Sequence, residues 1–346
     1  MMSGVNPADA ATRAKSRRGS LIDSTRMRQL IQQTPEQLTA TVADSGYRAE
    51  MDLYAGRFTG AELVEVALSH NLGREINSVL GFCGGNLGDQ VRVFAARFGY
   101  ANAKIVLRAV FNEVDVDDVA HNLLPVENED NGIWLDIIKN NSTLHEAAGN
   151  MREKQYRGAF KSLSEESTLS DYEDALDRHY YSNALKVVSR KGAALGVLRS
   201  FLKSEIDHRN LLNLIQGAAI GMTPEDRQSR LIVGGSLIPK SQIIAASNAD
   251  LDGIVDLMRR STRFDASAFE EALDQSKEMF SLDPVVLWLQ SNQQAVLSRM
   301  SYLHPVSALP IIHYLSSKVQ EVANLRLIVR GREAGLEPEL LEAHIL

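Results

Sequence analysis

Three segments of the chain repeat one pattern without gaps, and this repetition limits the possible folds more than any other feature. The segments span residues 102–119, 210–227 and 324–341, and each begins with an asparagine. The fourth, fifth and twelfth positions after the asparagine are apolar in every copy. The three asparagines are 108 and 114 residues apart. This period is far longer than the roughly 34–47 residues of two-helix solenoid repeats, so it predicts three small helical bundles.

Each copy reads as a helix, a tight turn and a second helix. The apolar stripe after the asparagine continues for about three helical turns. The eleventh position holds Gly221 and Gly335 in two copies, where glycine can take the left-handed conformation that ends a helix, but Glu113 in the first. The thirteenth position predicts an N-cap, favourable in the first two copies and poor as Glu337 in the third. Proline follows it in two copies, as is common at the first residue of a helix.

The repeats predict the domain organisation. An Ala-Leu pair stands 34 residues before the asparagine in the first two copies, and the third copy carries an insertion between these points. We therefore expect bundles over residues 1–125, 126–235 and 236–346. Nine prolines in 346 residues are about half of average usage, which also favours helices. The predicted fold class is all-α.

Composition excludes several classes of protein. A net charge of −7 and a pI near 5.7 disfavour broad nucleic-acid binding, which needs a concentrated basic surface. No apolar run approaches the roughly 18–20 residues of a membrane span, and the first twenty residues lack the apolar core of a signal peptide. The single cysteine, Cys83, cannot form an internal disulfide. We expect a soluble chain, monomeric when isolated, that reaches a membrane only through a partner.

Patterns that resemble enzyme motifs are all incomplete. The glycine-rich stretch 81–88 lacks the Lys-Ser or Lys-Thr of a phosphate-binding loop, so it predicts a break between helices. His145-Glu146 begins a zinc-protease motif, but Gly149 stands where the second histidine belongs. Ser200 starts a Ser-x-x-Lys pattern without its partner motif, and Cys83 is expected to be a buried, inert thiol. We predict no catalytic residue, no cofactor and no bound metal.

Seven polar side chains hold repeat positions and are the candidate site residues. The asparagines have two interpretations: they satisfy backbone groups at a helix crossing, or they make a polar contact with a partner. We favour the first. The cationic members are expected to pack their apolar stems and keep their charged ends solvated or paired. The seven residues are Asn102, Lys104, Arg108, Asn210, Asn324, Arg326 and Arg330.

These motifs resemble a known family. The C-terminal stretch reads NLRLIVRGREAGLEPELLEAHIL and resembles the end of the C subunit of the archaeal-type (A-type) ATPase, the counterpart of the d subunit of the V-type ATPase. The stretch LKSEIDHRNLLNLIQG resembles the central asparagine helix of that family, and FGYANAKIVLRAVFNEVDVDDV resembles its first. The N-terminal TRAKSRRGSLI is also similar, although Ala10 and Ala11 replace an aromatic that is usual there. The resemblance covers essentially the whole chain.

The resemblance implies a fold and a role. It implies an all-helical funnel of three related bundles around a pseudo-threefold axis, with no catalysis of its own. The wide face would rest on the proteolipid ring, and the central hollow would take the end of the rotating shaft. The chain would then couple ATP synthesis or ion pumping to rotation, on the cytoplasmic face of the membrane and held there by other rotary ATPase subunits.

Two alternatives remain open from the sequence. The first is a soluble helical enzyme, in which the Gly- and Pro-containing segment 223–250 would form a lid over a cleft. The second is a general helical scaffold, which would be expected to show a period of roughly 40 residues. The observed spacing does not fit that shorter period.

Overall fold

The computed structural model describes residues 6–125, 131–151, 155–156, 158–189, 193–260 and 265–345. Over these ranges the chain forms helices and turns and no strand, which confirms the all-α prediction. None of the helices described is both long and apolar enough to cross a membrane. The chain divides into two compact units, Met1–Leu176 with Pro310–Leu346, and Asp177–Leu309. The three-bundle division of the sequence remains a prediction.

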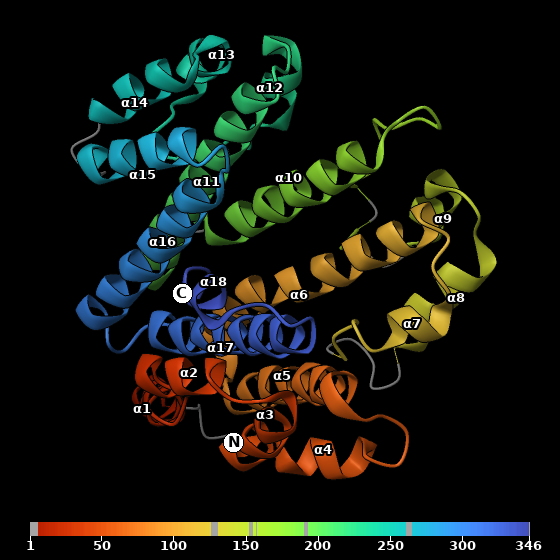
Figure 1. Ribbon diagram of the computed structural model, residues 1–346. Helices are drawn as coiled ribbons and strands as arrows, with labels where there is room; N and C mark the ends of the chain where they lie inside the picture. The colour runs from red at the N-terminus through yellow and green to blue at the C-terminus, as the bar shows by residue number, and fades with distance from the viewer. Residues whose placement is uncertain are drawn as a thin grey trace. The chain divides into compact units, whose positions relative to one another are not determined.

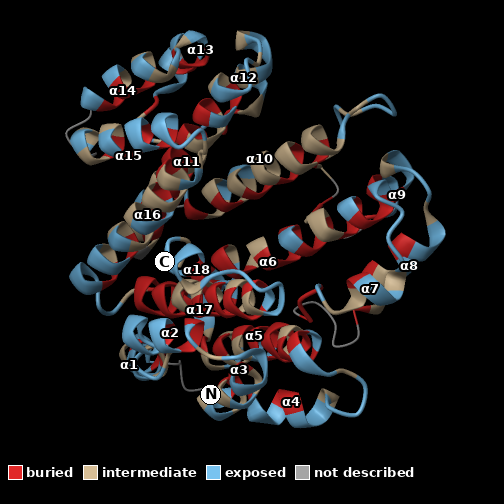
Figure 2. Cartoon of the chain, in the orientation of Figure 1, coloured by how far each residue is buried: buried red, intermediate tan, exposed pale blue. Residues whose placement is uncertain are grey.

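Two long helices lie side by side at the centre of the first unit, α5 and α17 (Figure 1). Both are mostly buried in Figure 2, and every residue from 308 to 315 at the start of α17 is buried. α3 and α4 pack against α5, whereas α8 and α9 pack against α6. The helices of this unit are α1 (Pro7–Arg18), α2 (Ser24–Ile31), α3 (Pro35–Val42), the short π-helical η1 (Ala43–Tyr47), α4 (Arg48–Tyr54), α5 (Gly60–Phe82), α6 (Gly85–Phe111), α7 (Val116–Ala120), α8 (Gly132–Asn140), α9 (Leu144–Asn150), α17 (Leu309–Glu333) and α18 (Pro338–Glu342).

The second unit is built on the packing of α11 against α16, with shorter helices around them. Its core includes Leu214, Ile215 and Phe269, each fully buried. α10 (Leu169–Val188) begins in the first unit and ends in the second. The other helices are α11 (Ala193–Ala219), α12 (Pro224–Arg230), the 3₁₀ turn η2 (Lys240–Gln242), α13 (Ile243–Asn248), α14 (Leu251–Arg259), α15 (Ala266–Glu278) and α16 (Asp283–Leu303).

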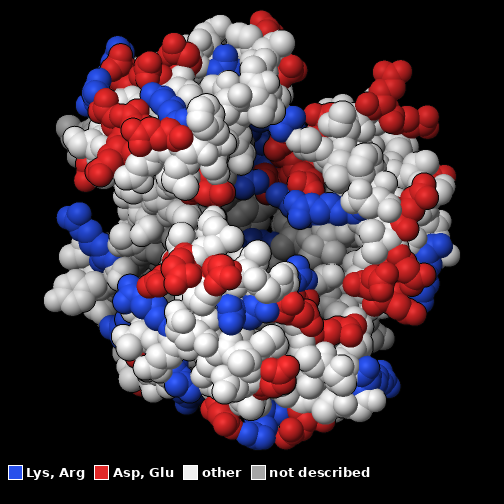
Figure 3. Space-filling view, viewed as in Figure 1, with Lys and Arg blue, Asp and Glu red and all other residues white. Residues whose placement is uncertain are grey.

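Charged side chains of both signs gather on one face of the second unit (Figure 3). Figure 3 shows acidic side chains gathered over α14 and α15, with basic side chains among them. Arg259 contacts Asp256 and Glu270, and Lys277 contacts Asp252 and Asp274. These exposed pairs neutralise the face locally, and each contributes little to stability.

The predicted turn after each asparagine helix has the same geometry in all three copies. Glu113, Gly221 and Gly335 have φ angles of 53°, 68° and 74°, all in the left-handed region. The next amide in each copy donates to the carbonyl five residues earlier, at 2.8–3.0 Å. This is the Schellman motif, which satisfies carbonyls left open at a helix end. Glu113 therefore adopts the backbone conformation that glycine adopts in the other copies.

The caps of the second helices follow the sequence prediction. Asp115 accepts a hydrogen bond from the amide of Asp117, and Thr223 accepts one from Asp226. Glu337 makes no side-chain capping bond. The short helices also pack closely on the preceding ones. A Cβ at Gly331 would lie 2.3 Å from a methyl carbon of Leu341, so a larger residue there would require the Leu341 side chain to shift.

The left-handed Glu113 leads to a stability prediction. A non-glycine residue in this conformation destabilises the folded state by about 1–2 kcal/mol. Replacing it with glycine removes this cost, but glycine also makes the unfolded chain more flexible, which offsets part of the gain. Glu113→Gly should therefore raise the unfolding free energy by about 0.5–1 kcal/mol, measured by urea denaturation. Gly221→Ala, the matched reverse change, should lower it by about 1 kcal/mol, because no atom lies within 4 Å of the added Cβ. A change of the same sign in the unfolding free energy of both variants would contradict the shared turn geometry.

Candidate functional site

Two repeat asparagines bind the backbone of the chain that returns after the second helix. The Asn102 amide nitrogen donates to the carbonyl of Leu124 at 2.8 Å, and its oxygen accepts from the Leu124 amide at 2.9 Å. Asn210 makes the same pair of bonds to Ile232, at 2.8 and 2.7 Å. Both partners stand 22 residues after their asparagine. Each buried asparagine thus satisfies both polar groups of one backbone residue.

Asn324 occupies the equivalent position in the third copy and is also buried. Its side-chain oxygen accepts a hydrogen bond from Gln320 at 2.9 Å. The residue 22 positions later is number 346, which lies outside the described residues. For this asparagine both interpretations, the favoured backbone contact and the partner contact, stay predictions.

Two arginines at the sixth position after the repeat asparagine form bidentate ion pairs with glutamates. The two glutamates also stand at equivalent positions of their repeats. Arg108 donates to Glu173 through two nitrogens, at 2.5 and 3.0 Å. Arg330 likewise binds Glu65, with Nη2 to Oε2 at 2.7 Å. Each glutamate stands 37 residues before an asparagine of the repeat. The pairs therefore join repeat one to repeat two and repeat three to repeat one through equivalent residues. Glutamine holds the arginine position in the second copy.

Arg326 lies one helical turn before Arg330 and is half-buried. Its Nη2 donates to the hydroxyl of Ser69 at 2.6 Å. Within the described part of the chain it has no carboxylate at ion-pair distance. The pKa of Arg326 is lowered overall, mainly by burial. The charge of Glu65 acts against this shift, and the charge of Arg330 adds to it. In contrast, the hydrogen bond to Glu65 raises the pKa of Arg330.

The three arginines meet in one cavity of about 380 Å³ in the first unit, which we call the arginine pocket. Helices α6, α7 and α17 supply its walls. Lys104 is half-buried on α6 and does not line the pocket, and Asn210 belongs to the second unit. The lining residues are Ile105, Arg108, Ala109, Asn112, Val114, Asp118, Val119, Asn122, Arg326 and Arg330.

The sequence singled out the arginines but missed the residues that position them. Glu65 and Ser69 are four residues apart on α5 and so share a helix face toward α17. Glu173 occupies the repeat position of Glu65, three residues before the leucine of an Ala-Leu pair. That shared spacing was the available signal. The pairing itself joins residues 265 positions apart and could not be read from the sequence.

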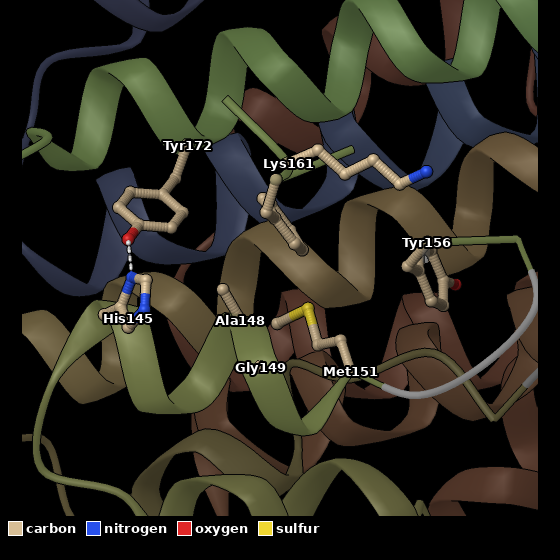
Figure 4. A pocket seen from close by; sticks show the side chains of 8 residues that line it. His145, Ala148, Gly149, Met151, Tyr156, Lys161 and Tyr172 are labelled. Atoms are coloured by element: carbon tan, nitrogen blue, oxygen red, sulfur yellow. Dashed lines mark hydrogen bonds between the residues drawn. The ribbon is translucent and has the colours of Figure 1, made fainter. Parts of the chain in front are cut away.

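A second cavity of the first unit, of about 450 Å³, is lined mainly by aromatic and small side chains. Figure 4 shows the Tyr172 hydroxyl pointing at the His145 ring, at 3.4 Å from Nδ1. The adjacent Glu146 accepts the amides of Ser142 and Thr143, so its carboxylate caps α9. No group of three metal-ligating side chains occurs in the ranges described.

Cys83 lies in the predicted break, between the end of α5 at Phe82 and the start of α6 at Gly85. Its side chain is buried, and burial raises the pKa of the thiol to about 11. A thiol with this pKa is protonated at neutral pH and is a poor nucleophile.

These features define an all-helical repeat protein whose equivalent helices are joined by repeated Arg–Glu pairs. The family model of the ATP synthase (C/AC39) subunit matches residues 10–344. The chain belongs to this family, which confirms the resemblance found in the sequence.

Three similar proteins share one name. The chain is 29% identical to the C subunit of the A-type ATP synthase of Haloquadratum walsbyi, over 100% of the chain and 99% of the relative. The protein of the same name from Haloferax volcanii is 28% identical, over 99% and 98%. That from Methanosarcina acetivorans is 25% identical, over 99% and 93%.

Proposed function

We propose that the chain is the non-catalytic central-stalk subunit of an A-type ATP synthase, which couples the rotating shaft to the proteolipid ring. Its partners would be the proteins of the shaft and the ring, and it would sit on the cytoplasmic face of the membrane through the complex. The seven repeat positions would serve mainly this rigid architecture. Three related bundles around a pseudo-threefold axis would form the coupling body.

The observation that carries this proposal is the repeated Arg–Glu junction in a chain of this family. Arg330–Glu65 ties α17 of the last repeat to α5 of the first, and Arg108–Glu173 ties α6 of the first repeat to α10. A body that transmits torque must resist shear between its parts. Repeated junctions, together with asparagines that hold the returning chain, supply such resistance.

The enzyme alternative rested on segment 223–250 as a lid. In the structure this segment contains α12, η2 and α13. Leu231, Ile232 and Ile238 within it are 3–4% exposed and belong to the packed interior. Its packing disfavours a mobile lid.

Membrane washing tests the proposal. Membranes that carry the complex should release the chain in low salt without detergent, because it is held by protein contacts. The detergent-solubilised complex should bring the chain down with the other ATP synthase subunits. The proposal fails if washing releases none of the chain and no other part of the ATP synthase accompanies it.

A further inference from the structure

We propose that the arginine pocket binds a carboxylate group of a neighbouring protein in the complex, and that Arg326 is the residue that receives it. The inference rests on the proposed function, since it names the chemistry of one contact within the ATP synthase. It goes further by assigning that contact to a particular cavity and a particular guanidinium.

Among the described residues, Arg326 is the pocket arginine that has no carboxylate at ion-pair distance. Arg108 and Arg330 are each held by a glutamate in a bidentate pair. Arg326 is held by the Ser69 hydroxyl, which is uncharged. Its guanidinium has five N–H donors, and the serine takes one of them. A half-buried cation whose only hydrogen-bond partner within the described ranges is an uncharged hydroxyl favours the arrival of an anion.

The amount and shape of this charge favour a carboxylate over a phosphate. Arg326 offers one guanidinium, which suits one singly charged carboxylate, whereas a phosphate dianion would bring two negative charges next to Asp118. The planar guanidinium fork also pairs with a carboxylate through two parallel hydrogen bonds. Ile105, Ala109 and Val119 give the cavity apolar walls that can pack on the methylene groups of an aspartate or glutamate side chain.

Asp118 also lines the pocket, and it limits what the site accepts. It is exposed on α7 and forms no ion pair with the three arginines at 4 Å or less within the described ranges. Its negative charge at the rim disfavours multivalent anions more strongly than a single carboxylate. The pocket therefore selects for low charge.

Burial of Arg326 leads to an unusual mutational signature. Because the isolated chain bears the desolvation cost of this charge, Arg326→Gln should leave its thermal midpoint unchanged or higher. The same change should weaken binding to the complex, where the charge is paired. Arg92→Gln on α6 is the matched control, because Arg92 forms an exposed pair with Asp89 and does not line the pocket.

The test uses membranes from which the chain has been removed by low-salt washing. Purified wild type, Arg326→Gln and Arg92→Gln are added back over a series of NaCl concentrations. At NaCl concentrations at which wild type rebinds, Arg326→Gln should bind roughly ten- to a hundredfold more weakly, with a flatter dependence on further added salt. Arg92→Gln should match wild type. If wild type itself does not rebind, the proposed function fails; if Arg326→Gln rebinds like wild type, only this inference fails.

A cross-link identifies the anion. Arg326→Lys places a primary amine in the pocket, and a carbodiimide joins it to an adjacent carboxylate as an amide, with release of the urea. Mass spectrometry of the reconstituted complex should find this lysine joined to an aspartate, glutamate or terminal carboxylate of another protein of the complex. A link only to Glu65 or Asp118 would overturn the proposal. Thermal stabilisation of wild type, but not Arg326→Gln, by inorganic phosphate would overturn it in favour of a free anion.

Discussion

Lys318→Met is expected to destabilise the first compact unit by about 3–5 kcal/mol, because it leaves a buried carboxylate without its cation. Lys318 donates to Glu321 and to the Tyr47 hydroxyl, both at 2.8 Å. All three side chains are buried, at 0–7% exposure. Glu321 also accepts the backbone amide of Ile22 at 2.6 Å. Burial, and next the charge of Glu321, raise the pKa of Tyr47, so the tyrosine stays neutral and donates its proton.

The measurement is urea unfolding of a version in which Trp134 is the only tryptophan. The chain has two tryptophans, Trp134 in the first unit and Trp288 in the second. The double variant Lys318→Met/Glu321→Gln should recover at least half of the loss, because the buried charge is gone. Lys277→Met, which removes an exposed lysine, should cost less than about 1 kcal/mol. Equal losses in the single and double variants would contradict the charge argument.

Asn210→Ala is expected to destabilise the second unit by about 2–4 kcal/mol. The change leaves both the amide and the carbonyl of Ile232 buried without their partner, and each such group costs about 1–3 kcal/mol. Unfolding should be followed through Trp288, with Trp134 replaced by phenylalanine. Asn102→Ala should produce a similar loss in the first unit, because Asn102 binds Leu124 in the same way.

Asn213→Ala is the matched control for this prediction. Asn213 lies one helical turn later, is half-buried, and donates one bond, to the carbonyl of Arg230 at 3.0 Å. Its removal should cost about 1 kcal/mol or less. If Asn213→Ala and Asn210→Ala are equally harmful, burial of the helix face matters more than the backbone clamp.

The sequence predicted the parts of the fold that depend on local residues. The break at Cys83, the turns at Gly221 and Gly335, and the poor cap at Glu337 all follow from short-range rules. Glu113 was the exception, since it adopts a left-handed turn without being glycine. There the turn between α6 and α7, closed by the hydrogen bond from Val114 to Ala109, holds the residue in a conformation that it does not prefer.

The sequence could not predict which distant side chains meet. Arg326 and Arg330 stood out by their repeat positions, but their partners Ser69 and Glu65 lie more than 250 residues away. Lys318 carried no signal at all, because a lysine in a helix is usually solvated. Its contact with Tyr47 spans 271 residues and depends on which helices pack around α17. Such contacts are set by tertiary packing, which local patterns do not encode.

Coupling between ATP hydrolysis and ion transport tests the central claim most directly. Membrane vesicles that carry the ATP synthase are stripped of this chain, and ATP hydrolysis and ion uptake are measured before and after the purified chain is added back. The account predicts that stripped vesicles lose ATP-driven ion uptake, that hydrolysis continues, and that adding the chain restores uptake. Ion uptake that persists at full rate without the chain would contradict the account.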